Sequence, residues 1–493
     1  MTDSKQAKLH GDHFYKFFQC PHWIWYDIYG DVSRKKMVSP LLDLIYKGKA
    51  LNVRNSLSSY KKFEEIKPEL FKDIEEAFLA TLDLMRQGKN IYHGVLMNDN
   101  WVGIADMLEA RPGKSNFGDF HYVVYDIQNS LSLRDENKFQ LIFYSLILER
   151  LQGARPEKAY VIDANGNEMS FLVDEFINEF NFTRGLIEKI LNGEKPAPFL
   201  KSGCKRTPWY ALCLEETKGC NDVSLIFKLS QADQRRLYDL GINTVGDLAK
   251  IDIDELQSKL EDWPFDKIVR INNQAKVLMS DEPMILRHGG FPNVKTEVYF
   301  DVEGDPTSNM DYLLGYLVKK DLPDRQAGGK VEYHYLMAKD KADESEMWKN
   351  FLDFLAGLDD FVIYHYAYYE RQVFDRLALK YGAPTSLVNK FRDNTIDLHA
   401  KLVDSAVLPL YFYSLKDVAG YLGYKWADPV AGGAESVVWY SEWLEAKDLP
   451  DRQAGNKILK RLLQYNEDDV RATMLIKEWL EKQKPHTSRE KLD

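Results

Sequence analysis

The sequence predicts an α/β protein with more than one domain, and three observations support this. The chain has 493 residues, which is more than one hydrophobic core usually holds. Its composition, 45% hydrophobic and 29% charged, is typical of a globular protein. Both halves combine strand-like and helical segments, and in the second half strands come first and helices follow between them, which favours a layered α/β arrangement.

Charge and hydropathy exclude some classes of protein. The net charge is -11 and the pI about 5.6, which argues against a protein that coats DNA nonspecifically, because that affinity comes from Lys and Arg. A local basic groove can still occur on an acidic protein. No apolar run reaches the roughly 18 residues that span a bilayer. The polar N-terminus lacks the apolar segment of a secretory signal, so we expect a cytoplasmic protein.

The first predicted domain covers residues 1–222. Residues 95–110 have the pattern of a β-hairpin and residues 121–128 that of a following strand. Residues 131–152 carry apolar side chains at helical spacing. This region is therefore expected to be mixed α/β.

The second predicted domain is a small helical module, residues 223–285. Two short helices are expected to meet at Leu240-Gly241-Ile242, and Thr244 is placed to cap the second helix. This resembles a helix-hairpin-helix, which presents backbone N–H groups to a DNA phosphate. A purely structural linker is the alternative.

The third predicted domain covers residues 290–485. It begins with strand-like residues 296–304, continues with residues 361–367, and ends on a long helix, residues 456–483. Strands followed by interleaved helices again indicate an α/β layer.

One nonapeptide occurs twice. Lys-Asp-Leu-Pro-Asp-Arg-Gln-Ala-Gly stands at residues 320–328 and again at 447–455. Both copies are polar, contain Pro and Gly, and fall between predicted elements, so they are expected to be exposed loops. A duplicated ligand-binding loop is the less favoured alternative to two insertions of a mobile DNA element at tolerant positions.

The third domain carries a set of carboxylates with the pattern of a metal site. Asp301 and Glu303 lie two apart on a predicted strand and share one face. Two adjacent carboxylates repel each other unless a cation neutralises them, and Mg²⁺ prefers oxygen ligands. Downstream, Tyr465 and Asp469 lie four apart on a predicted helix, again on one face, and Glu370 begins another helix after a strand.

These motifs resemble the DEDD exonuclease superfamily, which has a ribonuclease-H-like fold, in its Tyr-x-x-x-Asp version. The resemblance covers most of residues 295–480. It implies that Asp301, Glu303 and Asp469 bind two Mg²⁺ or Mn²⁺ ions and that Tyr465 orients the attacking water. The family's second motif usually supplies Asp, whereas this chain has Glu370, which reaches one methylene further.

The first domain resembles the RecB-like branch of the restriction-endonuclease-like, PD-(D/E)XK, superfamily. Gly103-x-x-Asp106, then Asp126, and then Gln140-x-x-x-Tyr144 carry this resemblance, which implies that Asp106 and Asp126 bind metal. The family's Lys is Gln128 here. A neutral amide cannot stabilise charge on a scissile phosphate as a Lys does, so this site is either weakened or a decayed scaffold.

The four cysteines are one early and three late along the chain: Cys20, Cys204, Cys213 and Cys220. This spacing fits either an iron–sulfur site or unrelated thiols. The RecB-like resemblance implies a [4Fe–4S] cluster, but Thr207 stands where that family has a cysteine.

The order of the three parts resembles a family of predicted RecB-like nucleases over nearly the whole chain. It implies a metal-dependent 3′→5′ exonuclease acting on nucleic acid, with DNA favoured over RNA. The alternatives are a non-catalytic nucleic-acid-binding protein and an accessory subunit of a repair or CRISPR-type complex. No Walker motif is present in the sequence, so any helicase partner would be another protein.

Overall fold

The computed structural model describes most of the chain, namely residues 8–36, 62–128, 133–163, 166–305, 308–320, 331–430, 432–448 and 452–484. The chain divides into two compact units, residues 1–216 and most of 217–493. Each unit contains its own sheet and hydrophobic core. Among the described residues, no helix combines the length and apolarity needed to cross a membrane.

The first unit is built on a mixed sheet with strand order β2-β3-β4-β5-β6-β7, and β1 pairs with β4. The predicted hairpin is present as β3 and β4, with Asp99 at positive φ in its turn. The predicted following strand is β5. The strands are β1 Leu9–His10, β2 Phe63–Glu65, β3 Asn90–Asn98, β4 Trp101–Ser115, β5 Gly118–Ile127, β6 Lys158–Ile162 and β7 Glu168–Leu172.

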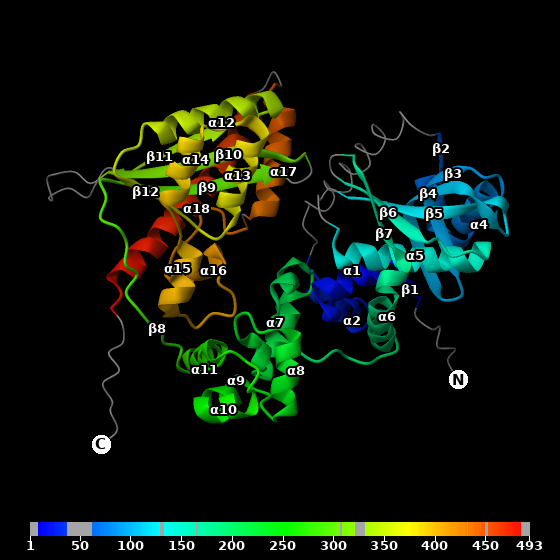
Figure 1. The fold of residues 1–493 in the computed structure, drawn as a ribbon, viewed down its shortest axis with the longest axis horizontal. Helices are drawn as coiled ribbons and strands as arrows, with labels where there is room; N and C mark the ends of the chain where they lie inside the picture. Colours follow the sequence, from blue (N-terminus) through cyan, green and yellow to red (C-terminus); the bar gives the residue numbers. More distant parts are fainter. Residues whose placement is uncertain are drawn as a thin grey trace. The chain divides into compact units, whose positions relative to one another are not determined.

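Helices cover one face of this sheet (Figure 1). The predicted helix is α5, and its apolar side chains Phe139 and Phe143 pack with Phe14 and Phe180 of neighbouring helices. The helices are α1 Asp12–Gln19, α2 Pro21–Tyr29, α4 Ile74–Arg86, α5 Asp135–Gln152, α6 Ile177–Leu191 and α7 Tyr210–Gly219.

The helical module of residues 223–285 lies in the second unit. Two helices meet at Gly241, whose φ of 77° is readily adopted only without a side chain. Thr244 caps the next helix by a capping box with Asp247, as its position in the sequence predicts. The helices are α8 Gln231–Asp239, α9 Val245–Lys250, α10 Ile253–Lys259 and α11 Phe265–Ser280.

The main sheet of the second unit has the order β11-β10-β9-β12-β13. Strands β9, β10 and β11 are antiparallel neighbours, whereas β12 and β13 continue the sheet in parallel with β9. This makes β9 an interior strand. The strands are β9 Thr296–Asp305, β10 Met310–Lys320, β11 Val331–Met337, β12 Phe361–His365 and β13 Thr395–Asp397, and a separate pair is β8 Met284–Ile285 with β14 Ala406–Val407.

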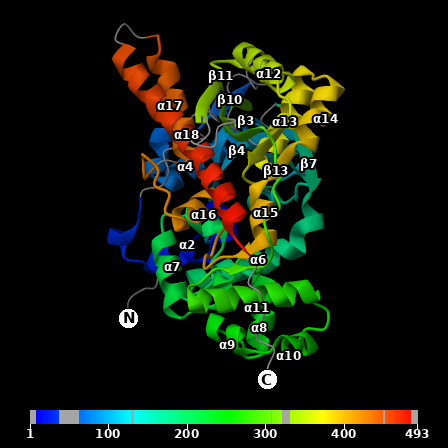
Figure 2. The ribbon, with the colours of Figure 1, turned by 90° about the vertical axis from the view of Figure 1, so that its left-hand side faces the viewer.

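The two faces of this sheet pack against different helices. Val298, Phe300 and Val302 of β9 join the core beneath α12, α13 and α14. Tyr299, one residue out of phase, joins the opposite core with α15, α16 and α18. Figure 2 shows α17 and α18 running side by side. The helices are α12 Lys341–Ala356, α13 Tyr369–Tyr381, α14 Thr385–Asp393, α15 Leu398–Ser405, α16 Leu415–Tyr421, α17 Gly433–Ala446 and α18 Arg452–Lys482.

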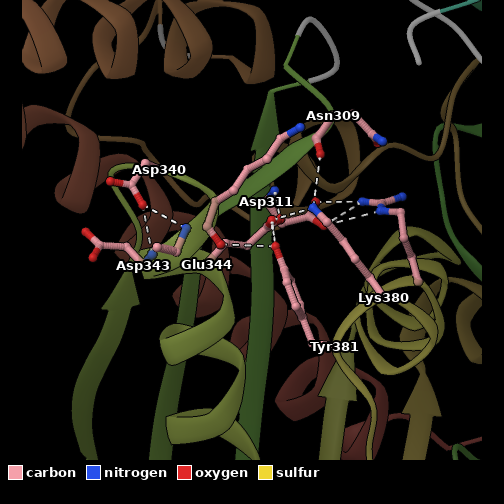
Figure 3. Close-up of polar contacts among 10 residues, drawn as sticks. Asn309, Asp311, Asp340, Asp343, Glu344, Lys380 and Tyr381 are labelled. Carbon is pink, nitrogen blue, oxygen red and sulfur yellow. Dashed lines mark hydrogen bonds and ion pairs between the residues drawn. The ribbon is translucent and has the colours of Figure 1, made fainter. Parts of the chain in front are cut away.

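A buried polar network holds α12 and α13 to the start of β10 (Figure 3). The Asp311 amide donates to Glu344 at 2.7 Å, and Lys380 and Tyr381 each donate to Glu344 at 2.5 Å. Arg376 donates to Asp311 at 2.6 Å. Asp311 and Glu344 are almost fully buried, so these partners are needed to offset their lost hydration.

The structure describes most of the second copy of the nonapeptide but little of the first. Residues 321–328 lie outside the described residues. In the second copy the loop prediction is wrong for Arg452–Gly455, which form the first turn of α18. Gly455 is buried there, and a Cβ atom added to it would stand 3.2 Å from the carbonyl oxygen of Ala446. The helix extends back into the repeat because this turn packs on α17.

Candidate active site

The first two candidate ligands lie on β9, the interior strand. Because Val298, Phe300 and Val302 face α12, the alternation of a strand directs Asp301 and Glu303 to the α18 face. Glu303 is 6% exposed and Asp301 is half-buried. The spacing in the sequence therefore predicts their common face correctly.

Helix α18 brings Tyr465 and Asp469 to the same face, one turn apart. Both side chains are buried. Asp301, Glu303 and Asp469 each offer an oxygen within 4.8 Å of the other two. Within the described part of the chain, these three side chains are the only group of three or more His, Cys, Asp or Glu residues close enough to share a metal ion.

Each of the three carboxylates also accepts a hydrogen bond from an uncharged side chain. Asn466 donates to Asp301 at 2.7 Å and Ser436 donates to Glu303 at 2.7 Å. The indole of Trp426 donates to Asp469 at 2.6 Å. Such donors fix one carboxylate oxygen in place, so the carboxylates are oriented before any cation binds.

Two of these donors are held by tyrosines of the sheet. Tyr333 donates to the amide oxygen of Asn466 at 2.8 Å, and Tyr312 donates to Ser436 at 3.0 Å. Asn466 is fully buried and lies against Gly315 of β10, where a Cβ atom would stand 1.5 Å from its amide oxygen. Gly315 therefore provides the space in which Asn466 reaches Asp301.

Sequence reasoning missed these supporting residues. Ser436 lies on α17, and nothing in its local pattern marks it. Trp426 ends residues 413–426, which resemble a connecting segment of the DEDD exonuclease family, but that resemblance assigns no role to the tryptophan. Asn466 had one available signal, since it directly follows Tyr465 on the helix that carries Asp469. Its neighbour Gly315 is a glycine within a strand, which often marks a close approach of another group.

Burial raises the pKa of all three carboxyl groups, mutual repulsion adds to this shift at Asp301 and Glu303, and bound cations would relieve that repulsion. Burial, then repulsion from Asp469, Glu303 and Glu370, raises the pKa of Asp301 well above its ordinary value. Burial and Asp469 raise the pKa of Glu303 to about 8. Burial also raises the pKa of Asp469, to about 6. Oxygen ligands gathered at this distance with unneutralised charge fit a hard divalent cation such as Mg²⁺ or Mn²⁺.

Glu370 lies near this group but is not part of it. It is 4% exposed at the start of α13, and its Oε2 lies 3.5 Å from His365 Nδ1. Burial raises the pKa of Glu370, and His365 is the main group that lowers it. Glu370 contributes to the raised pKa of both Asp301 and Glu303. The predicted ligand thus lies on α13 close to the three carboxylates, and it is paired with His365 of β12.

Tyr465 interacts with the carboxylate of Asp469, one turn further along α18. Burial, then Glu303 and Asp469, raises the pKa of its phenol far above the ordinary value. The phenol is therefore protonated at neutral pH. It can donate a hydrogen bond or orient a water molecule, but it does not act as a base.

In the first unit, the residues predicted to form a metal site make hydrogen bonds within the protein. Asp106 on β4 accepts a hydrogen bond from the Ile127 amide at 2.9 Å. The amide of Gln128 donates to Asp126 at 2.9 Å. Gln140 donates to Tyr144 at 2.9 Å. Gln128 is thus an uncharged hydrogen-bond partner for Asp126.

Three of the four cysteines lie together in the first unit. Cys20, Cys204 and Cys213 are buried, Cys20 Sγ lies 3.7 Å from Cys213 Sγ, and Cys204 interacts with both. Cys220 is exposed in the second unit. Thr207 donates to the Cys204 carbonyl at 2.9 Å. This arrangement does not support the four-thiolate ligand set of a [4Fe–4S] cluster.

Comparison with known proteins finds a family match for residues 298–481, a part of the second unit. A family model described as the RNase_H superfamily matches residues 298–481. These residues include all the strands and helices that carry the carboxylates. No curated protein matches the chain. Residues 298–481 therefore form a ribonuclease-H-like domain, which indicates a nuclease-type function and binding of nucleic acid.

Proposed function

We propose that this protein is a metal-dependent 3′→5′ exonuclease that hydrolyses phosphodiester bonds of single-stranded DNA or RNA. The observation that carries the proposal is the group Asp301, Glu303 and Asp469, which bring oxygens from β9 and α18 within 4.8 Å of one another. Their mutual repulsion in a buried setting fits a site that holds divalent cations.

The residues divide the work. Asp301, Glu303 and Asp469 hold the metal ions, and Glu370 completes the ligand set from α13, through a rotation towards the group or through a water molecule. When bound, Mg²⁺ or Mn²⁺ would polarise the phosphate and activate the attacking water. Tyr465, protonated and one turn from Asp469, orients that water. Asn466, Ser436 and Trp426 keep the carboxylates in position.

The test is digestion by the purified protein. Single- and double-stranded DNA and RNA, labelled at the 3′ or the 5′ end, are incubated with Mn²⁺ or with EDTA. We expect a 5′-labelled single strand to give a metal-dependent ladder of shortening products, and a 3′-labelled strand to release mononucleotide at once. Release of the 5′ label first would contradict the direction. Absence of cleavage of every strand would contradict the function.

Asp301→Asn and Asp469→Asn are expected to abolish this digestion, because each removes a negative charge that no neighbouring residue supplies. Asp404→Asn is a matched control, since Asp404 is an exposed carboxylate of the same domain paired with Arg287. Its activity should equal that of the wild type. Circular dichroism and thermal unfolding check that all three variants are folded.

A second function is favoured for the first unit. The hydrogen bond from Gln128 to Asp126 replaces the lysine that stabilises charge on the phosphate in active relatives of the RecB type. We propose that this unit binds nucleic acid without cutting it. Residues 223–285, with α8 and α9 meeting at Gly241, are proposed as a helix-hairpin-helix contact to a DNA backbone. On this view DNA is the favoured substrate, and a partnership with a repair or CRISPR-type complex stays open.

A further inference from the structure

Lys416 lies close to the carboxylates of Glu303 and Asp469. It is the second residue of α16, whose start is fixed by the capping box of Ser414 and Asp417. Its Nζ lies 5.2 Å from the ring centroid of Tyr465 and 5.6 Å from that of Trp426. Both aromatic residues contact Asp469. The ammonium is therefore held at the edge of the site by two ring faces.

The ammonium forms no ion pair within 4.0 Å among the described residues. Other lysines of this domain do: Lys477 pairs with Glu297 at 2.5 Å, and Lys319 pairs with Glu478 at 2.8 Å. Lys416 is only half-buried. A half-buried ammonium resting on aromatic rings keeps its N–H donors available for an incoming anion.

The charges around Lys416 indicate which anion its ammonium would bind. Lys416 is close enough to Glu303 and Asp469 to lower the pKa of both against the larger effect of burial. When these carboxylates bind divalent cations, their negative charge is committed and the cations repel the ammonium. A non-bridging oxygen of a phosphate bound at the same cations is then its natural partner.

We propose that Lys416 is a catalytic residue, which donates a hydrogen bond to a non-bridging oxygen of the scissile phosphate at the Asp301–Glu303–Asp469 site. The inference rests on the proposed phosphodiester hydrolysis and names the group that supplies the positive charge there. The contact strengthens as negative charge accumulates on the phosphate oxygens during attack by water.

The test compares Lys416→Met and Lys416→Arg with wild type in the full-length protein. Loss of a single donor aimed at developing charge lowers kcat by on the order of 100-fold, so we expect this fall for Lys416→Met, with KM nearly unchanged. Lys416→Arg should retain more activity. Affinity for Mn²⁺, measured calorimetrically without nucleic acid, and the melting temperature should match wild type.

Lys401→Met is the matched control, because Lys401 is also half-buried and lies over an aromatic ring, that of Phe291, at 5.8 Å. It should leave kcat unchanged. A wild-type kcat in Lys416→Met, a rise in KM alone, or a loss that saturating Mn²⁺ restores would each overturn the proposal. The last outcome would mean that Lys416 acts only on the carboxylates.

A second readout separates this inference from the proposed function. Thymidine monophosphate is titrated into Mn²⁺-loaded protein. Its terminal phosphate carries more negative charge than a phosphodiester and so resembles the phosphate during attack, and we expect Lys416→Met to bind it about tenfold more weakly than Lys401→Met does. If wild type cuts no strand, the proposed function fails, and this titration still decides whether Lys416 contacts a phosphate. Equal affinities in the two variants would show that it does not.

Discussion

At the scale of single residues, the site depends on uncharged groups that orient charged ones. Asn466 is fully buried, accepts from Tyr333 and donates to Asp301. An amide suits this place because it offers a donor to the carboxylate and an acceptor to the phenol at once. An aspartate at the same position would place another negative charge 2.7 Å from Asp301.

Asn466→Ala is therefore expected to lower the rate of strand digestion by about 10- to 100-fold, the usual effect of losing a residue that orients a metal ligand. The affinity for Mn²⁺ should fall as well. Asn272→Ala is the control, because Asn272 is an equally buried asparagine that donates only to backbone carbonyls of the helical module. Both variants should lose stability. If both also lose activity to the same extent, Asn466 has no specific role.

The raised pKa of Glu303 makes a prediction about stability. Its pKa is about 8 in the folded protein against an ordinary 4.5, so the folded state binds this proton more tightly than the unfolded chain does. The resulting stabilisation is complete below the ordinary pKa and is lost as the pH rises through about 8. In EDTA, the melting temperature of wild type should therefore fall between about pH 5 and about pH 9.

Glu303→Gln should show a smaller fall than wild type over that range, because the amide does not titrate. Glu442→Gln, which changes an exposed glutamate on α17, should behave as wild type. Adding Mn²⁺ to wild type at the upper pH should raise the melting temperature, because the ion binds the folded carboxylates. Parallel curves for Glu303→Gln and wild type in EDTA would refute a raised pKa at Glu303.

At the scale of elements, the sequence predicts those parts of the site whose geometry is local. Asp301 and Glu303 share a face because a strand alternates, and Tyr465 and Asp469 share one because they are a helical turn apart. Ser436, Trp426 and Lys416 reach the same carboxylates from α17, from the segment before it and from α16. Their positions depend on how these segments dock on the sheet, which no short-range pattern encodes.

The repeated nonapeptide also shows that short-range patterns do not encode contacts between segments. A polar segment with Pro and Gly predicts a loop, but in the second copy Arg452–Gly455 continue α18 backwards because Gly455 packs closely on Ala446. The local composition is overridden by a contact with a neighbouring helix. Two identical segments are therefore expected to tolerate deletion differently.

Deleting residues 321–328 should leave folding and activity nearly unchanged. Lys319 pairs with Val331 across β10 and β11, so the deletion leaves Lys320, Gly329 and Lys330 to connect the strands, a short loop of a common hairpin length. Deleting residues 448–455 removes the first turn of α18 and should lower the melting temperature clearly. Thermal unfolding of both variants checks this. Equal melting temperatures would contradict the packing described for Gly455.

At the scale of the whole molecule, the candidate sites of the two units differ in how closely their carboxylates are grouped. The second unit gathers three carboxylates within metal-binding distance, and its residues 298–481 match the RNase_H superfamily. In the first unit, Asp126 accepts from Gln128 and Asp106 from a backbone amide. The sequence predicts both sets of residues, but the strength of each site depends on distances that only the folded chain provides.

Asp106→Asn is accordingly expected to change 3′→5′ digestion by less than about twofold, whereas Asp301→Asn should abolish it, because we propose that the metal ions bind the carboxylates of the second unit. The measurement is the initial rate on a 5′-labelled single strand with saturating Mn²⁺. The opposite result, a loss in Asp106→Asn with full activity in Asp301→Asn, would assign catalysis to the first unit.

Gly315 has a consequence for how this protein tolerates genetic change. It has no functional group, yet any side chain there would collide with the amide oxygen of Asn466, 1.5 Å from the position of its Cβ atom. In a saturation mutagenesis screen scored by nuclease activity, codon 315 should reject every replacement, as the codons of the carboxylates do. An inert position would then be indistinguishable from a reactive one in such data, and only the structure explains why.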